Sequence, residues 1–253
     1  MNGWKGLICL ICTAFLVACA STGGAPDASD EARKAAEVNT ALGREYMSRG
    51  QNEVALEKLK KAIAADPDYA PGHTMIAVLY EQIGEMELAG KHYQKAVKAS
   101  PRNGDVNNNY GVFLCATGRY AEAEKYYLQA VEDPFYSTPE VAYGNAGSCM
   151  LQDRNLTKAE KYLRQSIEYN KQFTDSLMAM SDLKYRTDDY MSARAFLQRY
   201  EAAGGMSAEG LFMGMQIERR LGDSRTAQEY ENQLLRRYPD SVEAREVLAG
   251  GVE

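Results

Sequence analysis

The stretch "YGVFLCATGRYAEAEKYYLQA", residues 110–130, decides the fold of this chain of 253 residues, because its small and bulky positions recur elsewhere. Its marker residues are Tyr110, Gly111, Leu114, Gly118, Ala123, Tyr127 and Ala130. The segment 34 residues earlier carries Ile76, Ala77, Tyr80, Gly84, Ala89, Tyr93 and Ala96 at the same positions. Spacing and residue type agree, so the chain contains an internal repeat.

The repeat extends along most of the chain. Alignment on the alanine of each unit gives Ala55, Ala89, Ala123, Ala159, Ala193 and Ala227, with spacings of 34, 34, 36, 34 and 34 residues. A 34-residue period is typical of tetratricopeptide repeats, in which each unit is a pair of antiparallel helices. The sequence therefore predicts an all-α fold: a right-handed α-solenoid of six tetratricopeptide repeats over residues 36–241, with a C-terminal capping helix at 242–253. In repeats five and six, Lys184 and Glu218 stand where an aromatic residue is usual.

The small residues mark the points where the two helices of a repeat cross closely, since a larger side chain there would push the helices apart. The residues expected at these crossings are Gly43, Ala77, Gly111 and Gly147. Proline at Pro67 and Pro101 ends two of the second helices, because it lacks the N–H group and restricts the residue before it.

The first residues predict an export signal. An apolar run of 13 residues follows Lys5, whereas a membrane-spanning helix needs about 20. The tetrapeptide Leu-Val-Ala-Cys at residues 16–19 resembles the lipobox of bacterial lipoproteins, in which the signal is removed and the cysteine carries acyl chains. The sequence therefore predicts a lipoprotein signal peptide at residues 1–18 and lipidation of Cys19.

The residue after the cysteine indicates which membrane anchors the protein. In the lipoproteins that it resembles, aspartate after the cysteine retains the protein at the inner membrane. Here that residue is Ala20, so the resemblance implies an outer-membrane, lipid-anchored location that faces the periplasm. Three acyl chains exceed the two signals that stable anchoring takes. Residues 19–35 are rich in small and polar side chains and predict a flexible linker.

The composition and motifs favour a protein partner. The formal net charge of −6 gives no basic surplus for binding nucleic acid. His73 and His92 lack the companions of a metal site, and no nucleotide-binding or hydrolase motif is present. We therefore expect no enzymatic activity, no metal or other cofactor and no small-molecule substrate.

The inner wall of such a solenoid is formed by the first helices, and its residues can be counted from the register. The predicted peptide-binding residues are Thr40, Arg44, Met47, Thr74, Val78, Asn108, Val112, Ser148, Leu151, Met178 and Tyr185. The same wall carries Glu81, Cys115, Gly144 and Asp182. Through the first four repeats these side chains are mostly small, apolar or uncharged, which suits a peptide held by apolar contacts and backbone hydrogen bonds. About half of them could instead pack against each other.

Two features allow alternative interpretations. Cys115 and Cys149 lie on neighbouring first helices, and either they are small buried apolar residues or they form a disulfide bond in an oxidising compartment. The two extra residues between repeats three and four fall in "DPFYSTPE", residues 133–140. This segment is either a contact loop or a longer loop whose rings pack on neighbouring helices, and we favour the second interpretation.

The chain resembles the PilF/PilW family of type IV pilus biogenesis lipoproteins in four features. These are the lipobox, the linker, the repeat number and the run "NNNYGVFLCATGRYAEAEKYYLQAVEDPFY" at residues 107–136. The resemblance implies a pilotin, a lipoprotein that binds subunits of a PilQ-type secretin and promotes their localisation and multimerisation in the outer membrane. It assigns no particular secretin-binding residues.

A second hypothesis is a scaffold lipoprotein that regulates peptidoglycan enzymes in the envelope, because other tetratricopeptide lipoproteins resemble such adaptors. The fold and the lipid anchor would serve both functions. The "DPFY" turn and the two mid-stack cysteines favour the pilus family.

Overall fold

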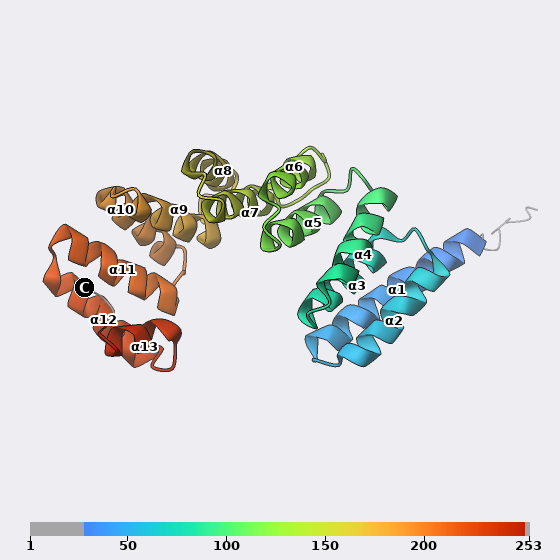
Figure 1. Ribbon diagram of the computed structural model, residues 1–253, viewed down its shortest axis with the longest axis horizontal. Helices are drawn as coiled ribbons and strands as arrows, with labels where there is room; N and C mark the ends of the chain where they lie inside the picture. Colours follow the sequence, from blue (N-terminus) through green and yellow to red (C-terminus); the bar gives the residue numbers. More distant parts are fainter. Residues whose placement is uncertain (1–27, 251–253) are drawn as a thin grey trace, which may run out of the picture.

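The computed structural model describes residues 28–250, which are built from helices without strands (Figure 1). The helices of this part of the chain are α1 (Ala28–Ser48), α2 (Asn52–Ala65), α3 (Ala70–Gln82), α4 (Met86–Ala99), α5 (Gly104–Ala116), α6 (Tyr120–Val131), α7 (Pro139–Gln152), α8 (Leu156–Tyr169), α9 (Thr174–Arg186), α10 (Tyr190–Ala202), α11 (Ala208–Leu221), α12 (Ser224–Arg237) and α13 (Val242–Leu248). None of the helices in residues 28–250 combines the length and the apolar character needed to span a membrane.

Consecutive helices form six pairs, from α1/α2 to α11/α12, and α13 follows the last pair. In Figure 1 the pairs follow one another along an arch, from α1 and α2 in blue to α12 and α13 in red. Neighbouring pairs contact each other through their first helices, as α1 does with α3 and α7 with α9. This arrangement confirms the predicted α-solenoid of six tetratricopeptide repeats with a helix at its C-terminal end.

The first helix begins earlier than predicted. Residues 19–35 are expected to be linker, but α1 begins at Ala28. The guanidinium carbon of Arg33 lies 4.4 Å from the centroid of the Tyr69 ring, and its Nη1 donates to Asp66 at 2.9 Å. These contacts with the turn between α2 and α3 stabilise the additional turns of α1, which is why the predicted linker is too long at its C-terminal end.

The close helix crossings lie where the small residues predict them. A Cβ atom added to Gly111 would lie 2.8 Å from the Tyr127 ring, and one added to Gly147 would lie 2.6 Å from Cγ of Leu163. A Cβ atom added to Gly43 would lie 2.5 Å from Cγ of Leu59 on its partner helix. Any side chain at these positions would force the two helices apart, so the register predicted for repeats one, three and four is confirmed.

A buried apolar cluster runs through repeats two to six. Where repeat two meets repeat three, the Tyr93 ring packs on two others, with centroid separations of 5.9 Å to Tyr110 and 5.2 Å to Phe113. Such ring contacts stabilise the boundary beyond the area that they bury.

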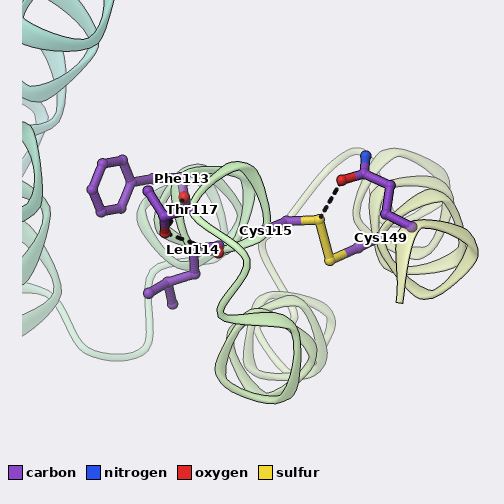
Figure 2. The surroundings of a disulfide bond; sticks show 6 residues. Phe113, Leu114, Cys115, Thr117 and Cys149 are labelled. Carbon is purple, nitrogen blue, oxygen red and sulfur yellow. Dashed lines mark hydrogen bonds between the residues drawn. A yellow bond between two sulfur atoms is a disulfide. The ribbon is translucent and has the colours of Figure 1, made fainter. Parts of the chain in front are cut away.

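Repeats three and four are also joined covalently. Cys115 in the last turn of α5 and Cys149 in the last turn of α7 form a disulfide bond (Figure 2), and their Cα atoms are 5.8 Å apart. Both residues are buried. Of the two interpretations of these cysteines, the structure has the disulfide, which ties neighbouring first helices to each other.

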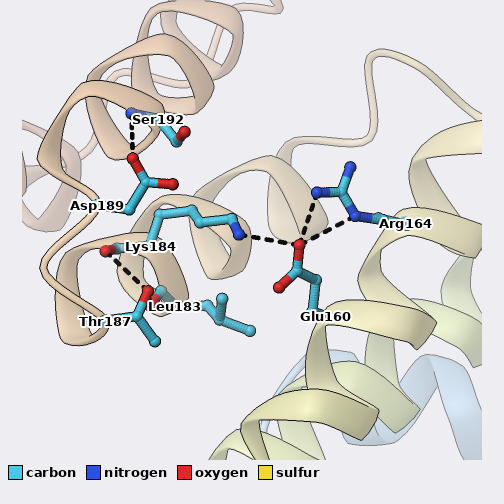
Figure 3. Close-up of polar contacts among 7 residues, drawn as sticks. All are labelled: Glu160, Arg164, Leu183, Lys184, Thr187, Asp189 and Ser192. Atoms are coloured by element: carbon cyan, nitrogen blue, oxygen red, sulfur yellow. Dashed lines mark hydrogen bonds and ion pairs between the residues drawn. The ribbon is translucent and has the colours of Figure 1, made fainter.

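Ion pairs replace the usual aromatic residue in the last two repeats. Lys184 of α9 donates to Glu160 of α8 at 2.9 Å, and Glu160 also accepts from Arg164 (Figure 3). Glu218 of α11 is buried and accepts two hydrogen bonds from Arg194 of α10. In both cases a charged pair connects the second helix of one repeat with the first helix of the next, so the weaker sequence pattern there reflects a different kind of contact.

The last helix covers the C-terminal end of the stack. α13 begins after Ser241, whose hydroxyl accepts a hydrogen bond from the backbone N–H of Ala244. Ala244 is fully buried, in one cluster with Leu211 of α11 and Leu234 of α12. The apolar face of the sixth repeat is thereby shielded from solvent, as the end of a solenoid requires.

Candidate functional site

The first helices carry most of the predicted peptide-binding residues on accessible surface. Those that are at least partly exposed are Arg44, Met47, Val78, Asn108, Val112, Ser148 and Tyr185. Leu151 and Met178 are largely buried, with exposed fractions of 6% and 8%. One polar contact crosses this wall, since Asn108 accepts a hydrogen bond from Asn145 of the next repeat at 3.0 Å.

The structure places Thr40 and Thr74 inside the protein, which corrects their assignment to the groove. Their exposed fractions are 2% and 4%. The Thr74 hydroxyl donates to the backbone oxygen of Ala70 in its own helix. Thr40 Oγ1 faces α3, at 3.4 Å from the position of a Cβ atom on Gly72. Both residues therefore fill space between helices and leave no side-chain atoms for a ligand.

A hollow of about 490 Å³ opens along the first helices of the last three repeats. Its lining residues are Ser148, Leu151, Gln152, Asp175, Met178, Ala179, Asp182, Arg186, Tyr200, Ser207 and Glu209. Ser148, Leu151 and Met178 belong to the predicted wall, so this hollow is a C-terminal part of the predicted groove. We call it the C-terminal groove.

The floor of the C-terminal groove is apolar. Leu151, Met178 and Tyr200 line it while each remains more than nine-tenths buried. The Tyr200 hydroxyl donates to Ser207 Oγ at 2.9 Å, so the phenol already has its hydrogen-bond partner. A ligand therefore meets apolar surface there and no unpaired polar group of the floor.

The rim of the C-terminal groove is charged. Arg186 pairs with Asp182 through both carboxylate oxygens, at 2.9 and 2.8 Å. Burial, with the nearby carboxylates of Glu243 and Asp182, raises the pKa of the Glu209 carboxyl. Each of these effects disfavours the ionised form of Glu209, so a cation brought to the rim would stabilise that form.

Counting the wall from the register misses Asp175 and Glu209. These residues are 34 positions apart and lie in the first turns of α9 and α11. Asp175 precedes Met178, the first counted wall position of repeat five, by about one helical turn, and no position of repeat six was counted. Extending the count by that turn and into repeat six would have found both, whereas Tyr200 and Ser207 come from a second helix and a loop that the count leaves out.

A second hollow, of about 580 Å³, lies beside the turn between α2 and α3. Its His73 donates from Nε2 to the Pro67 backbone oxygen at 2.9 Å and faces Nδ1 of His92 with its own Nδ1 at 3.0 Å. Because a carbonyl only accepts, His73 carries its proton on Nε2, and Nδ1 of His92 is the donor between the rings. Burial lowers the pKa of His73 and lowers that of His92 to about 4. Within residues 28–250 no three histidine, cysteine or acidic side chains are grouped to hold a metal ion.

The two aromatic rings of the loop between repeats three and four differ in burial. Tyr136 is partly buried, and its Cγ would lie 2.5 Å from a Cβ atom on Gly104. Phe135 is 91% exposed. Asp133 holds the loop by accepting from the backbone N–H groups of Phe135 and Gly104 at 2.9 and 2.8 Å. The packing interpretation thus describes Tyr136 but not Phe135.

The prediction of lipidation at Cys19 falls outside residues 28–250, as does the predicted signal peptide. Both remain predictions from the sequence.

The chain is similar to proteins of known families over most of its length. The tetratricopeptide repeat family matches residues 40–104, 92–125 and 141–173. The chain is 34% identical over 220 residues to the type IV pilus assembly protein PilF of Pseudomonas aeruginosa, covering 87% of this chain and 86% of that protein.

Two solved structures are similar to this chain in both fold and sequence. PilW, a widely conserved type IV pilus biogenesis factor, superposes with a TM-score of 0.78 and 29% identity, covering 84% of this chain and 98% of PilW. Pseudomonas aeruginosa PilF superposes with a TM-score of 0.76 and 33% identity, covering 87% of this chain and 99% of that chain. The protein belongs to the PilF/PilW family of tetratricopeptide-repeat factors in type IV pilus biogenesis.

Proposed function

We propose that the protein is a pilotin: an outer-membrane lipoprotein that binds secretin subunits through its tetratricopeptide surface and promotes their localisation and multimerisation. The observation that carries the proposal is the 34% identity to PilF across 87% of this chain. That match extends over 220 residues, far more than a single repeat of 34, so it exceeds what a shared solenoid fold implies.

The anchor in this proposal is Cys19. The apolar run before it and the small, polar residues after it have the order of a bacterial lipoprotein signal. Ala20 follows the cysteine, which supports the outer membrane over the inner membrane. The acyl chains would hold the repeat array at the membrane in which a secretin multimer assembles.

The repeat array in this proposal is a binding surface without catalysis. Its accessible first helices and the hollow of about 490 Å³ offer an apolar floor with a polar rim, as peptide-binding grooves do. The formal net charge of −6 supports a protein partner over nucleic acid. The proposed partner is therefore a segment of the secretin, and neither a cofactor nor a small-molecule substrate is needed.

The experiment that tests the function is deletion of the gene in its own host, followed by assay of outer-membrane fractions for the heat- and detergent-resistant secretin multimer. We expect loss of the multimer while the secretin monomer is still made, and restoration of the multimer by the wild-type gene. A Cys19→Ala gene should restore a folded protein in the wrong compartment and little multimer.

An intact multimer in the deletion strain contradicts the pilotin proposal. In that case the scaffold function in peptidoglycan metabolism would be examined next, by testing the deletion strain for altered sensitivity to cell-wall antibiotics.

A further inference from the structure

The C-terminal groove has two unlike edges. Successive first helices of a solenoid run in the same direction, so the first turns of α9 and α11 lie along one edge of the hollow and the last turns of α7 and α9 along the other. Asp175 and Glu209 stand in those first turns. Gln152 and Arg186 stand in the last turns of α7 and α9. One edge is therefore acidic, and the other carries an amide and a guanidinium.

The charges of the two edges are not equally neutralised. Arg186 is bound to Asp182 through both carboxylate oxygens. Among the ion pairs of residues 28–250, none includes Asp175 or Glu209, although the neighbouring repeats pair Lys184 with Glu160 and Arg194 with Glu218. The acidic edge thus keeps two carboxylates without a cation of the protein's own. Their charge is available to a cation on a ligand.

The apolar floor between the two edges favours a ligand that also carries an apolar side chain. Leu151, Met178 and the Tyr200 ring form this floor, and Ala179 and Ser148 also line the hollow. A hollow of about 490 Å³ has room for a few side chains of a bound segment. An apolar side chain of the ligand would remove this floor from water, while a basic side chain would reach the acidic edge.

We propose that the C-terminal groove binds a peptide segment in which a lysine or arginine stands next to an apolar residue, with the apolar side chain on the Leu151 and Met178 floor and the cation between Asp175 and Glu209. This inference rests on the proposed function, because it assigns the segment to the secretin. Charge complementarity selects the partner: an acidic segment would meet like charges at this edge, and like-charge juxtaposition disfavours binding.

The experiment uses the purified full-length lipoprotein in detergent and an array of overlapping peptides that span the periplasmic part of the host's secretin. The test variant is the double substitution Asp175→Asn, Glu209→Gln, which removes both charges and keeps similar side-chain shapes. The control variant is Asp105→Asn, Glu168→Gln. It removes the same charges outside the groove, and Asp105 holds in repeat three the register position of Asp175 in repeat five. Circular dichroism verifies that each protein is folded.

We expect the wild-type protein to retain peptides that share a basic residue beside an apolar one. The test variant should bind these peptides about fivefold to twentyfold more weakly, as removal of two exposed charge pairs implies. The control variant should bind like the wild type, and raised salt should weaken the wild type more than the test variant. Ser148→Arg, which places a cation inside the groove, should also reduce binding.

Equal binding by the wild type and the test variant, capture of peptides without basic residues, or capture of no peptide each overturns this inference. The secretin-multimer assay in the deletion strain is read separately. If the multimer depends on the protein but the groove variant binds normally, the inference fails and the proposed function stands; if the multimer does not depend on the protein, the proposed function itself fails.

Discussion

Arg194 of α10 and Glu218 of α11 form a bidentate ion pair across the boundary between repeats five and six. Nε of Arg194 donates to Oε1 of Glu218 at 2.7 Å, and Nη2 donates to Oε2. The side chain of Glu218 is 4% exposed, and that of Arg194 is 28% exposed. Tyr46 and Tyr80 hold the equivalent position in the first two repeats, so a charged pair takes the place of a ring at this boundary.

Removing one partner of this pair should cost much more than removing both. Arg194→Met leaves a buried carboxylate without its counterion and should lower the free energy of unfolding by about 3 kcal/mol. The double variant Arg194→Met, Glu218→Met should lose far less, because apolar residues of similar volume often replace a buried pair at little cost. Urea denaturation of the wild type, both single variants and the double variant gives the coupling energy. Additive losses would mean that the two side chains do not depend on each other.

The Glu160 cluster should make stability depend on acid pH. Hydrogen bonds from Lys184 and then from Arg164 lower the pKa of the Glu160 carboxyl. A carboxyl whose pKa is lower in the folded state stabilises the fold above its unfolded pKa, and this stabilisation is lost as the pH falls through the folded pKa.

We therefore expect the wild type to lose more stability between about pH 6 and about pH 3 than the Glu160→Gln variant does. Lys184→Met removes the first cause of the shift and should flatten the pH dependence in the same direction. Thermal unfolding over this pH range is the measurement, and coincident curves for all three proteins would contradict the assignment.

The period of the sequence was sufficient to predict the repeat array, because it reports helix crossings that admit only small residues. Gly111 and Gly147 are examples: each faces a bulky side chain of its partner helix at a distance that excludes a Cβ atom. The start of α1 could not be read in this way. Its first turns carry no repeat marker, and they are held by contacts between Arg33 and Tyr69 that lie 36 positions apart.

The groove was predictable in outline but not in detail. Register gives the direction in which each wall residue points, but it does not give how closely successive first helices approach. Thr40 and Thr74 are buried for that reason, whereas Ser148 at a later wall position lines a hollow. The acidic edge was missed because Asp175 lies one turn before the residues counted in repeat five, and because the count did not extend to repeat six, where Glu209 lies.

The disulfide should contribute strongly to stability. It closes a loop between positions 34 residues apart, for which chain entropy gives about 4 kcal/mol. The Cys115→Ala, Cys149→Ala variant avoids burying new polar groups and should lose about this free energy of unfolding in urea. A reducing agent should destabilise the wild type by a similar amount and leave the variant unchanged. Equal stability of reduced and oxidised wild type would contradict the prediction.

Phe135 and Tyr136 form a matched pair for testing the loop between repeats three and four. Tyr136→Ala should lower the free energy of unfolding by about 2 kcal/mol, because the ring packs on Gly104 and is partly buried. Phe135→Ala should change it by less than about 0.5 kcal/mol, because the ring is 91% exposed. Urea denaturation measures both, and equal losses would show that the two rings are packed alike.

The Phe135→Ala variant, which keeps the fold, also separates the two interpretations of the loop in the secretin-multimer assay. A reduced level of multimer identifies Phe135 as a contact residue, and a wild-type level assigns the loop to packing alone.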